Sequence, residues 1–432
     1  MIKANTIIEF NDDGGWCWFQ DKRAIIVNDC LILTSVASGY LDEKRQGNIE
    51  ITSYNFHTQE ISRVILHKED DPLIKAIWCD DHSAPSICLC EDNHILVAYC
   101  RHHKDNKIYY RRSSYPFDAS TWEEEKIFIP SEKSRVTYSN LFQIIENGKS
   151  KVYNFYRGFQ GQFKPSWSIS DDDGVSFIKS GLLIDFKSNF LHRPYIKFVS
   201  NNRSFIHFAY TEGHPRDFNN SIFHAYYKDG WIYKTDGRKI RMLKEGPMDV
   251  KDGTLVFTSD QDNVAWISDL HVAKDNLPYL AFSVQKNSAG LPRGDGGLDH
   301  RYHYAYFDGT DWQQKEIAYA GTRIYAGEDD YTGLITLDSS DKNIIFISSN
   351  VNPNDGKSLI SNADNKNHYE IFMGKLNKNL SCEWYALTTD SSCDNLRPIV
   401  VENGSKKILI WLSGKMTSYT NYKFKIVGME IS

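Results

Sequence analysis

Side chains that transfer protons or carry positive charge recur along this chain in pairs about twenty residues apart. The pairs are His82 with His102, Tyr138 with Arg157, and His192 with His214, at spacings of 20, 19 and 22 residues. Histidine exchanges protons near neutral pH, and arginine holds a carboxylate through two parallel hydrogen bonds. A tyrosine exchanges its proton when neighbouring cations stabilise the phenolate. Brought together, these side chains would suit an anionic ligand.

The same side-chain types match what β-elimination from a uronic acid requires. The carboxylate of the sugar must be neutralised so that the proton on C5 becomes acidic. A base then removes that proton, and an acid protonates the departing O4 oxygen. Each of these residues could instead have a purely structural role. A histidine at a strand end often only forms hydrogen bonds. Tyr138 could pack within a sheet, and Arg157 could pair with an acidic neighbour. Their joint recurrence in three successive segments favours a functional role.

Other catalytic signatures are missing from the sequence. There is no G-x-S-x-G nucleophile elbow, no H-E-x-x-H zinc motif and no P-loop. Serine hydrolase, zinc protease and nucleotide chemistry are therefore poorly supported.

The stretch DDHSAPSICLCEDNHILVAYCRHH, which contains His82 and His102, indicates how such groups are positioned. Two apolar runs, Ser86–Cys90 and His94–Cys100, flank a polar turn of Glu-Asp-Asn, which predicts a β-hairpin. A hairpin returns the chain to its starting edge, so His82 and His102 are expected at the same end of one sheet. His103 competes with His102, but adjacent residues of a strand alternate, so His103 should point to the other face.

This hairpin occurs seven times along the chain, at separations of 61, 56, 54, 74, 65 and 65 residues. The predicted first strands start near Asp21, His82, Tyr138, His192, Trp266, Tyr331 and Leu396. A weaker second hairpin usually follows, so each unit contributes four strands. The repeat predicts an all-β fold, a seven-bladed β-propeller with four-stranded antiparallel blades. Two β-sandwiches are the alternative, but they would not explain one hairpin returning at one spacing. No linker divides the chain, so residues 1–432 are expected to form a single catalytic domain.

A propeller determines which residues meet. The first strand of each blade lines a central channel, and the residues that flank the first two strands ring one mouth of it. The repeat therefore brings together residues from blades two, three and four: His82, His102, Tyr138, Arg157, His192, Arg193, Tyr195 and His214.

Composition excludes several classes of partner. The net charge is −6 and no basic block is present, which argues against nucleic-acid binding. No apolar run approaches ~18 residues, so no membrane span is expected. A signal peptide is not recognisable, so the chain is expected in the cytoplasm, or secreted or periplasmic if a leader was removed. The eight cysteines are too sparse for a disulfide framework, Cys88 and Cys90 are predicted to be buried free thiols, and a monomer is expected.

Motifs spread over nearly the whole chain carry a family resemblance. They are GGWCWFQDKRA from Gly14, DDHSAP from Asp80, YRRSS from Tyr110, TYSN from Thr137, YRG from Tyr156, RPYIKF from Arg193, TEGHPRDFNNSIFHAYYKDG from Thr211, DHRYHYAYFDG from Asp299 and DDYTGLITLD from Asp329. In addition, SDDDGVSF from Ser170 fits the Asp-box turn of sialidase-type blades. Together the motifs resemble the BNR-4 type propellers, which include propeller-type ulvan lyases and related L-rhamnose-α-1,4-D-glucuronate lyases.

The resemblance implies which residues act. The catalytic positions are His82, His102, Tyr138 and Arg157, and the substrate-binding positions are Arg193, Tyr195 and His214. The family's carboxylate-neutralising arginine matches Arg157, which we expect to be helped by His102 or His214. His82 and Tyr138 are expected to share the base and acid roles, in an order that stays open.

The resemblance also implies the activity. We expect a polysaccharide lyase that cleaves L-rhamnose-α-1,4-D-glucuronate linkages of an ulvan-like or related anionic polysaccharide or oligosaccharide, leaving a 4,5-unsaturated uronate. Two alternatives stay open: a propeller α-L-rhamnosidase that hydrolyses the same linkage, and a glycan-binding propeller without catalysis. No cofactor is required for the chemistry. Some relatives bind a structural metal ion, whose ligands stay unknown here, with His224, His300 and His303 as candidates.

Overall fold

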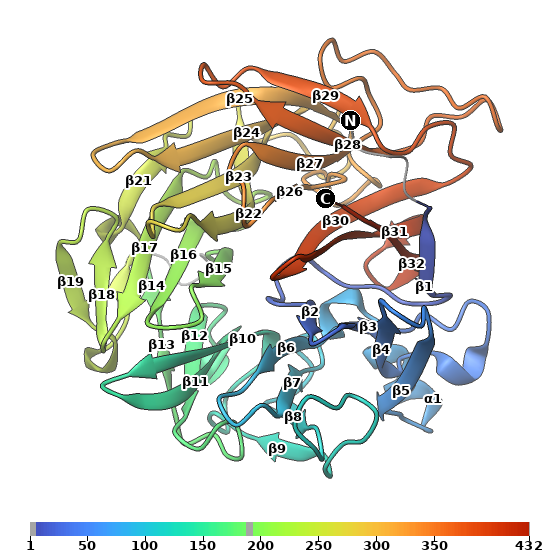
Figure 1. The fold of residues 1–432 in the computed structure, drawn as a ribbon. Helices are drawn as coiled ribbons and strands as arrows, with labels where there is room; N and C mark the ends of the chain where they lie inside the picture. The colour runs from blue at the N-terminus through green and yellow to red at the C-terminus, as the bar shows by residue number, and fades with distance from the viewer. Residues whose placement is uncertain (1–5, 187–192, 432) are drawn as a thin grey trace.

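Seven antiparallel sheets stand around a central axis as the blades of a propeller, as the sequence repeat predicts (Figure 1). The computed structural model describes residues 6–186 and 193–431. Blade one contains β2 (Ala24–Val27), β3 (Cys30–Val36), β4 (Ile49–Asn55) and β5 (Ile61–His67). Blade two contains β6 (Ser86–Leu89), β7 (Ile95–Tyr99), β8 (Ile108–Arg112) and β9 (Lys126–Phe128). Blade three contains β10 (Thr137–Glu146), β11 (Lys149–Arg157), β12 (Pro165–Ser170) and β13 (Lys179–Leu182).

Blade four is the largest, with β15 (Ile196–Ser200), β16 (Phe205–Thr211), β17 (Ile222–Lys228), β18 (Trp231–Lys234), β19 (Lys239–Met242) and β21 (Thr254–Phe257). Blade five contains β22 (Val264–Val272), β23 (Pro278–Gln285), β24 (His300–Phe307) and β25 (Trp312–Gly321). Blade six contains β26 (Ile335–Leu337), β27 (Ile344–Ser349), β28 (Glu370–Leu376) and β29 (Cys382–Ala386). A short parallel pair, β14 (Ile184–Asp185) with β20 (Met248–Asp249), lies outside the blades.

Blade seven joins the two ends of the chain. It contains β30 (Asp394–Asn403), β31 (Lys406–Ser418) and β32 (Asn421–Glu430), and its outermost strand is β1 (Ile8–Asn11). The antiparallel pairing of β1 with β32 brings the N-terminal strand against the C-terminal one and closes the ring (Figure 1).

The inner strands begin at Ala24, Ser86, Thr137, Ile196, Val264, Ile335 and Asp394, each within four residues of its predicted start. One predicted start, His192, lies outside the described residues. The central strands are buried on both faces because neighbouring blades pack against each other. All five residues of β7 and all eight of β23 are buried, whereas β5, at the rim of blade one, buries only Leu66. β-Branched and aromatic residues fit such a pleated, packed surface, which is why this composition favours blades over helices.

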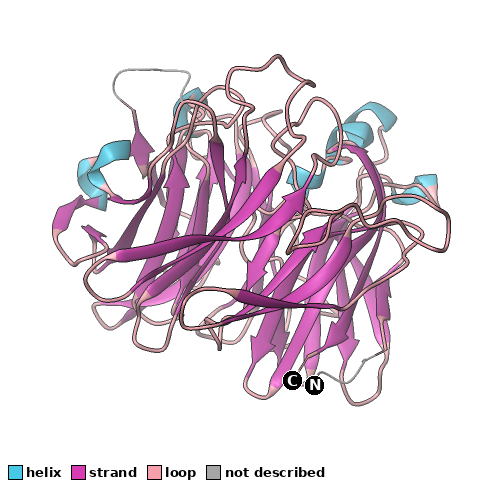
Figure 2. Cartoon of the chain, turned by 90° about the horizontal axis from the view of Figure 1, so that it is seen from above, coloured by secondary structure: helices cyan, strands magenta, loops and turns pink. Residues whose placement is uncertain are grey.

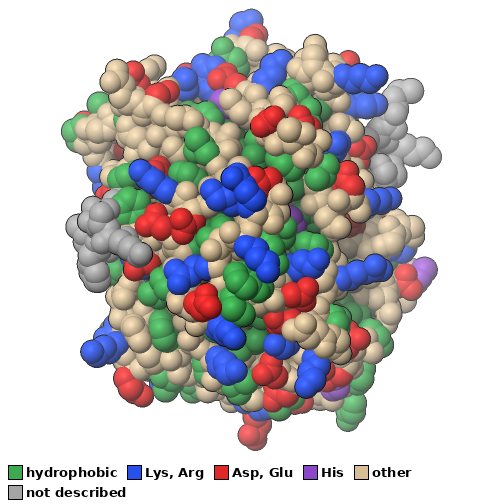
Figure 3. Space-filling model, turned by 90° about the vertical axis from the view of Figure 1, so that its left-hand side faces the viewer, with side chains coloured by type: hydrophobic (Ala, Val, Ile, Leu, Met, Phe, Trp, Pro, Cys, Tyr) green, Lys and Arg blue, Asp and Glu red, His purple; other side chains and the backbone are tan. Residues whose placement is uncertain are grey.

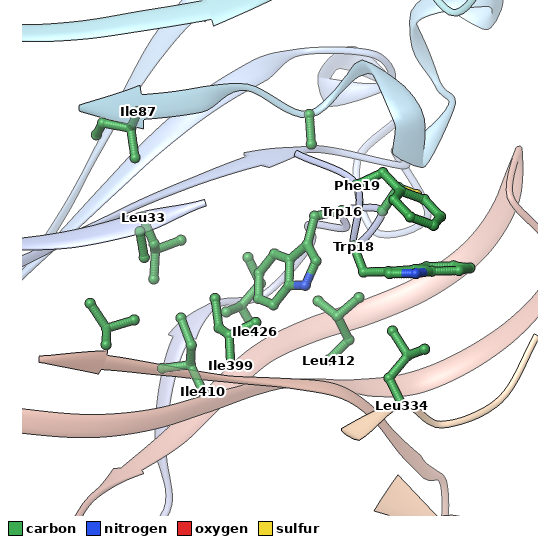
Figure 4. Close-up of a cluster of buried hydrophobic side chains, with 14 of the residues drawn as sticks. Trp16, Trp18, Phe19, Leu33, Ile87, Leu334, Ile399, Ile410, Leu412 and Ile426 are labelled. Atoms are coloured by element: carbon green, nitrogen blue, oxygen red, sulfur yellow. The ribbon is translucent and has the colours of Figure 1, made fainter. Parts of the chain in front are cut away.

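The segment between β1 and β2 crosses the channel mouth. Trp16 is fully buried with Leu412 and Ile426 in the core between blades seven and one (Figure 4). The ring of Trp18 lies 5.0 Å from the rings of both Trp266 and Tyr331. This segment therefore fills the channel and bridges blades that are distant in sequence.

Short helices lie on the face of the disc opposite the two termini (Figure 2). They are α1 (Pro72–Trp78) and the 3₁₀ turns η1 (Glu43–Arg45), η2 (Asp81–Ser83), η3 (Phe159–Gly161), η4 (Leu243–Glu245) and η5 (Val250–Asp252). Among the described residues, no helix has the length and apolar character needed to cross a membrane. On the side of the molecule shown in Figure 3, Lys and Arg side chains are interspersed with Asp and Glu.

The predicted Asp-box lies in the turn between β12 and β13 and stabilises it. The Asp172 carboxylate accepts hydrogen bonds from the hydroxyls of Ser170 (2.7 Å) and Ser176 (2.6 Å), and from the Ser176 backbone N–H (2.9 Å). The motif therefore acts as a structural turn. Cys88 and Cys90 are buried free thiols, as predicted.

Candidate active site

His82 and His102 lie face to face at the channel mouth. Their rings are 4.2 Å apart with 9° between the planes. His82 belongs to η2, just before β6, and His102 follows β7, so the hairpin returns both to one edge as expected. His82 is buried, whereas the His102 side chain stays 18% exposed.

A single carboxylate orients both histidines. Asp80, the N-cap of η2, accepts from His82 Nδ1 through one oxygen (2.8 Å) and from His102 Nδ1 through the other (3.0 Å). Because a carboxylate only accepts, both Nδ1 atoms carry hydrogen, and the lone pair of a neutral ring is then on Nε2. Asp81 adds a second anion, with one oxygen 2.7 Å from His82 Nδ1 and the other 2.6 Å from Arg397 Nη1.

The two rings differ in charge although they share one carboxylate. Burial opposes a charge on His82, yet the pKa of His82 is raised well above its ordinary value; Tyr138 and Cys17 act in this direction only when ionised, and at neutral pH the charge comes from the Asp81 and Asp80 carboxylates. Burial and the nearby positive charge of His82 lower the pKa of His102 to about 4. At neutral pH, therefore, His82 is the imidazolium and His102 is the neutral ring.

Tyr138 reaches the same place through a bulge in β10. The pairing of β10 with β11 shifts register between Thr137 and Asn140, and Tyr138 has a φ of 57°. A left-handed backbone at a bulky residue costs about 1–3 kcal/mol and often marks a functional position. The Tyr138 ring lies 5.5 Å from that of His82. Burial and Tyr195 raise the pKa of Tyr138 well above 10, although His82 and Arg157 act in the opposite direction, so the phenol keeps its proton at neutral pH.

Arg157, the last residue of β11, lies between two tyrosine rings. Its guanidinium carbon is 4.9 Å from the ring centroids of both Tyr138 and Tyr195. Within the described part of the chain, its buried Nε and Nη1 groups have no hydrogen-bond partner. A void of about 20 Å³, lined by these three residues and Phe19 among others, adjoins the guanidinium and has room for about one water. Unpaired N–H groups on a buried cation are ready donors for a carboxylate.

One sequence prediction is wrong at this point. His103 was expected to point away from the site, but its Nε2 accepts a hydrogen bond from Arg157 Nη2 at 2.7 Å, while its Nδ1 donates to the Arg135 carbonyl at 3.1 Å. Strand alternation does not apply because β7 ends at Tyr99 and His103 lies in a turn with a φ of 56°. Burial and the Arg157 charge lower the pKa of His103, so a neutral ring holds the guanidinium in place.

Blade four contributes Tyr195 and His214, whose rings are 5.3 Å apart. His214 Nδ1 accepts the backbone N–H of Arg216 at 3.0 Å, so the neutral ring carries its hydrogen on Nε2 and is a donor. Burial and the charges of Arg216, Arg193 and Arg157 lower the pKa of His214 well below its ordinary value. Arg193 pairs with Asp217 (2.8 Å) and is partly exposed, so it acts on His214 through its charge. His192 lies outside the described residues.

The segment that fills the channel also forms the floor of the site. The Phe19 ring lies 4.8 Å from Tyr195 and 5.7 Å from Tyr138. Gln20 Nε2 donates to the His82 carbonyl at 2.8 Å. From blade seven, the turn between β31 and β32 places the Tyr419 ring 5.1 Å from His82. The cluster is therefore enclosed from several sides, which strengthens its electrostatic interactions.

Sequence reasoning missed the groups that hold the histidines. Asp80 and Asp81 stood in the quoted DDHSAP motif without a role. Arg397, which binds Asp81, lies one residue after the predicted start of the last inner strand, and this position is the signal that could have revealed it. Its φ of 55° at a register shift in β30 repeats the geometry of Tyr138.

Two sets of three donors among the described residues lie close enough to hold a metal ion: Asp80 with His82 and His102, and Cys17 with Asp81 and His82. Both coincide with the cluster. The histidines suggested from the sequence are in neither set: His224, for example, bonds to His207 (3.2 Å) and Thr235 (2.8 Å).

The fold is similar to that of solved polysaccharide lyases. No curated protein sequence matches the chain significantly. A PL25 ulvan lyase solved bound to -[GlcA(1-4)Rha3S]- has a TM-score of 0.67 and 11% identity, covering 98% of this chain and 95% of that one. The polysaccharide lyase Uly1 has a TM-score of 0.59 and 11% identity, covering 99% and 97%. At such identities the likeness concerns the fold. A family model matches residues 37–320, and the chain therefore belongs to the BNR repeat-containing family.

Proposed function

We propose that this protein is a polysaccharide lyase that cleaves L-rhamnose-α-1,4-D-glucuronate linkages by β-elimination. The observation that carries the proposal is one enclosed cluster of a neutral histidine, a protonated tyrosine and an arginine with two N–H groups that no described residue accepts. Elimination from a uronate needs these three functions: a cation, a base and an acid. The overall likeness to an ulvan lyase bound to a glucuronate–rhamnose ligand supports the choice of linkage.

Arg157 is assigned to the carboxylate of the uronate. Its Nε and Nη1 groups point to opposite sides of the guanidinium, so a carboxylate binds in parallel at one of them together with a hydrogen of Nη2, whose other hydrogen is donated to His103. The adjoining void is smaller than a carboxylate needs, so the bound sugar must displace one of the flanking tyrosine rings slightly. Neutralising the carboxylate lowers the energy of the enolate-like state that forms when the C5 proton leaves.

His102 is assigned as the base. It is neutral at neutral pH, its Nε2 carries the lone pair, and it is the more exposed histidine of the stacked pair. This assignment differs from the sequence-based expectation, which gave the base or acid role to His82. His82 instead remains an imidazolium beside Tyr138 and stabilises negative charge there.

Tyr138 is assigned as the acid. As His102 takes the C5 proton, the electron pair of the C5–H bond forms the C4–C5 double bond. The C4–O4 bond breaks, and the Tyr138 phenol gives its proton to O4. Transfer of the proton from His102 back to the Tyr138 phenolate, directly or through water, restores the site.

Hydrolysis of the same linkage fits the cluster less well. Glycosidases use two carboxyl groups flanking the bond, one as acid and one as base or nucleophile. Here Asp80 is engaged by both histidines and Asp81 by Arg397. The two carboxylates beside the histidine pair therefore serve to position other groups.

The test is to incubate the protein with ulvan and with rhamnose- and glucuronate-containing plant glycans and follow near-ultraviolet absorbance. Elimination leaves a double bond conjugated to the carboxylate, so absorbance should rise with new chain ends. New reducing ends without absorbance would identify a hydrolase instead. Saturable binding with neither signal would identify a non-catalytic glycan-binding protein.

A further inference from the structure

A cavity of about 450 Å³ opens beside the catalytic cluster and has no part in the chemistry described so far. It lies between the segment after β16, the segment after β23 and the segment before β26. The backbone N–H of Arg216, in its wall, donates to His214, and Val264, also in its wall, is two residues from Trp266, whose ring lies 5.3 Å from that of His214. The cavity therefore lies close to His214, at the edge of the cluster, where it could hold a sugar next to the bound uronate.

Three arginines around this cavity each have a carboxylate partner, although two of them share one carboxylate. Arg216 and Arg293 both pair with Glu328, at 2.5 and 3.0 Å. Arg323 pairs with Asp329 at 3.1 Å. A sulfate ester needs a cation that is not already paired, and in this cavity it would have to compete with these carboxylates.

Two other buried groups in the lining are suited to hydroxyls. Gln285 and Asp330 are 5% and 6% exposed, and Gln285 Nε2 donates to Asp330 at 3.1 Å. Gln285 Oε1 is buried and, within the described residues, has no hydrogen-bond partner. An unpartnered buried amide oxygen is costly, and a ligand hydroxyl would satisfy it.

The carboxyl group of Asp330, beside the Gln285 amide, also suits an uncharged ligand. Burial and the neighbouring Glu328 raise the pKa of Asp330 to about 7, although Arg216 acts in the opposite direction. Asp330 can therefore both donate and accept near neutral pH, as a hydroxyl does. Pro215, Phe218, Val264 and Leu291 give the rest of the wall an apolar character.

We infer that this cavity is the subsite for the sugar adjacent to the uronate, and that it selects an uncharged 6-deoxyhexose over a sulfated one. The inference rests on the proposed function for the position of the uronate. Gln285 and Asp330 bind the ring hydroxyls, and the apolar wall accepts the C6 methyl group. This preference would differ from that suggested by the sulfated ligand of the solved ulvan lyase, which is -[GlcA(1-4)Rha3S]-.

The first experiment measures binding and does not depend on catalysis. Methyl α-L-rhamnopyranoside and its 3-O-sulfate are titrated into the wild-type protein by calorimetry, with saturation-transfer NMR as a second readout. The neutral glycoside should bind at least about tenfold more tightly. Gln285→Leu and Asp330→Asn should each weaken its binding about tenfold, the usual effect of losing one buried hydrogen bond. The matched surface variants Gln313→Leu and Asp311→Asn should bind as the wild type does.

The second experiment compares cleavage of native and chemically desulfated ulvan. The desulfated polymer should be cleaved with the higher kcat/KM, and Gln285→Leu should reduce that advantage. Equal or tighter binding of the sulfated glycoside, no binding of the neutral one, or unchanged binding in both folded cavity variants would overturn the subsite. Absence of cleavage of either polymer, with the binding preference intact, would reject the lyase proposal and leave the subsite standing.

Discussion

His82 and His102 stack in parallel, 4.2 Å apart, and both donate from Nδ1 to the two oxygens of one aspartate. Two imidazolium rings at this distance would repel each other strongly, so protonation of one suppresses protonation of the other. The arrangement therefore keeps one charged and one neutral ring side by side. A site with these two states can hold a cation and a base without moving any residue.

Replacing Asp80 should abolish the difference in charge between the His82 and His102 rings. In Asp80→Asn the amide has one acceptor and one donor, so it cannot accept from both histidines, and one ring should rotate or change tautomer. We expect kcat to fall on the order of 100-fold or more, with thermal stability measured alongside. Asp311→Asn, at an exposed position, is the matched control. Wild-type rates in a folded Asp80→Asn protein would show that the shared carboxylate is unimportant.

The acid limb of the pH profile should reveal the base. His102 must be neutral to accept a proton, and its pKa is lowered to about 4. The kcat/KM should therefore stay high as the pH falls through 6.5 and decline only near pH 4, by tenfold per unit. Circular dichroism at each pH separates this titration from unfolding. A decline centred near 6.5 would mean that His102 titrates as an ordinary histidine and is not the base in this environment.

Substitution of Tyr138 tests its role as the acid, and substitution of Arg157 tests its role in binding the uronate carboxylate. Tyr138→Phe removes the proton donor, and Arg157→Lys replaces a planar fork by a point charge. Each should lower kcat/KM on the order of 100-fold or more. Tyr385→Phe and Arg238→Lys, at exposed positions, should have no effect. Full activity in Tyr138→Phe would remove Tyr138 from the mechanism without excluding elimination by another acid.

The sequence was sufficient to predict the propeller and the meeting of residues from blades two, three and four. The reason is that a hairpin fixes where both its ends lie, whatever its side chains are. It was not sufficient for His103, because the turn after β7 has a left-handed residue that breaks strand alternation. Nor could it pair Asp81 with Arg397, which are 316 residues apart and meet only when blade seven closes the ring.

Closure of the ring is itself open to test at Phe10. This residue of β1 is 3% exposed, and its ring lies 5.3 Å from that of Tyr54 in blade one, so it packs the last blade against the first. Phe10→Ala should lower the free energy of unfolding by about 3–5 kcal/mol, the usual loss for a buried phenylalanine. Urea unfolding followed by tryptophan fluorescence measures it, because Trp16 and Trp18 follow β1 directly. Ile7→Ala, at a 47% exposed position just before β1, is the control and should cost well under half as much. Equal losses in the two variants would show that β1 contributes little to closing the ring, and that β30, β31 and β32 hold blade seven in place without it.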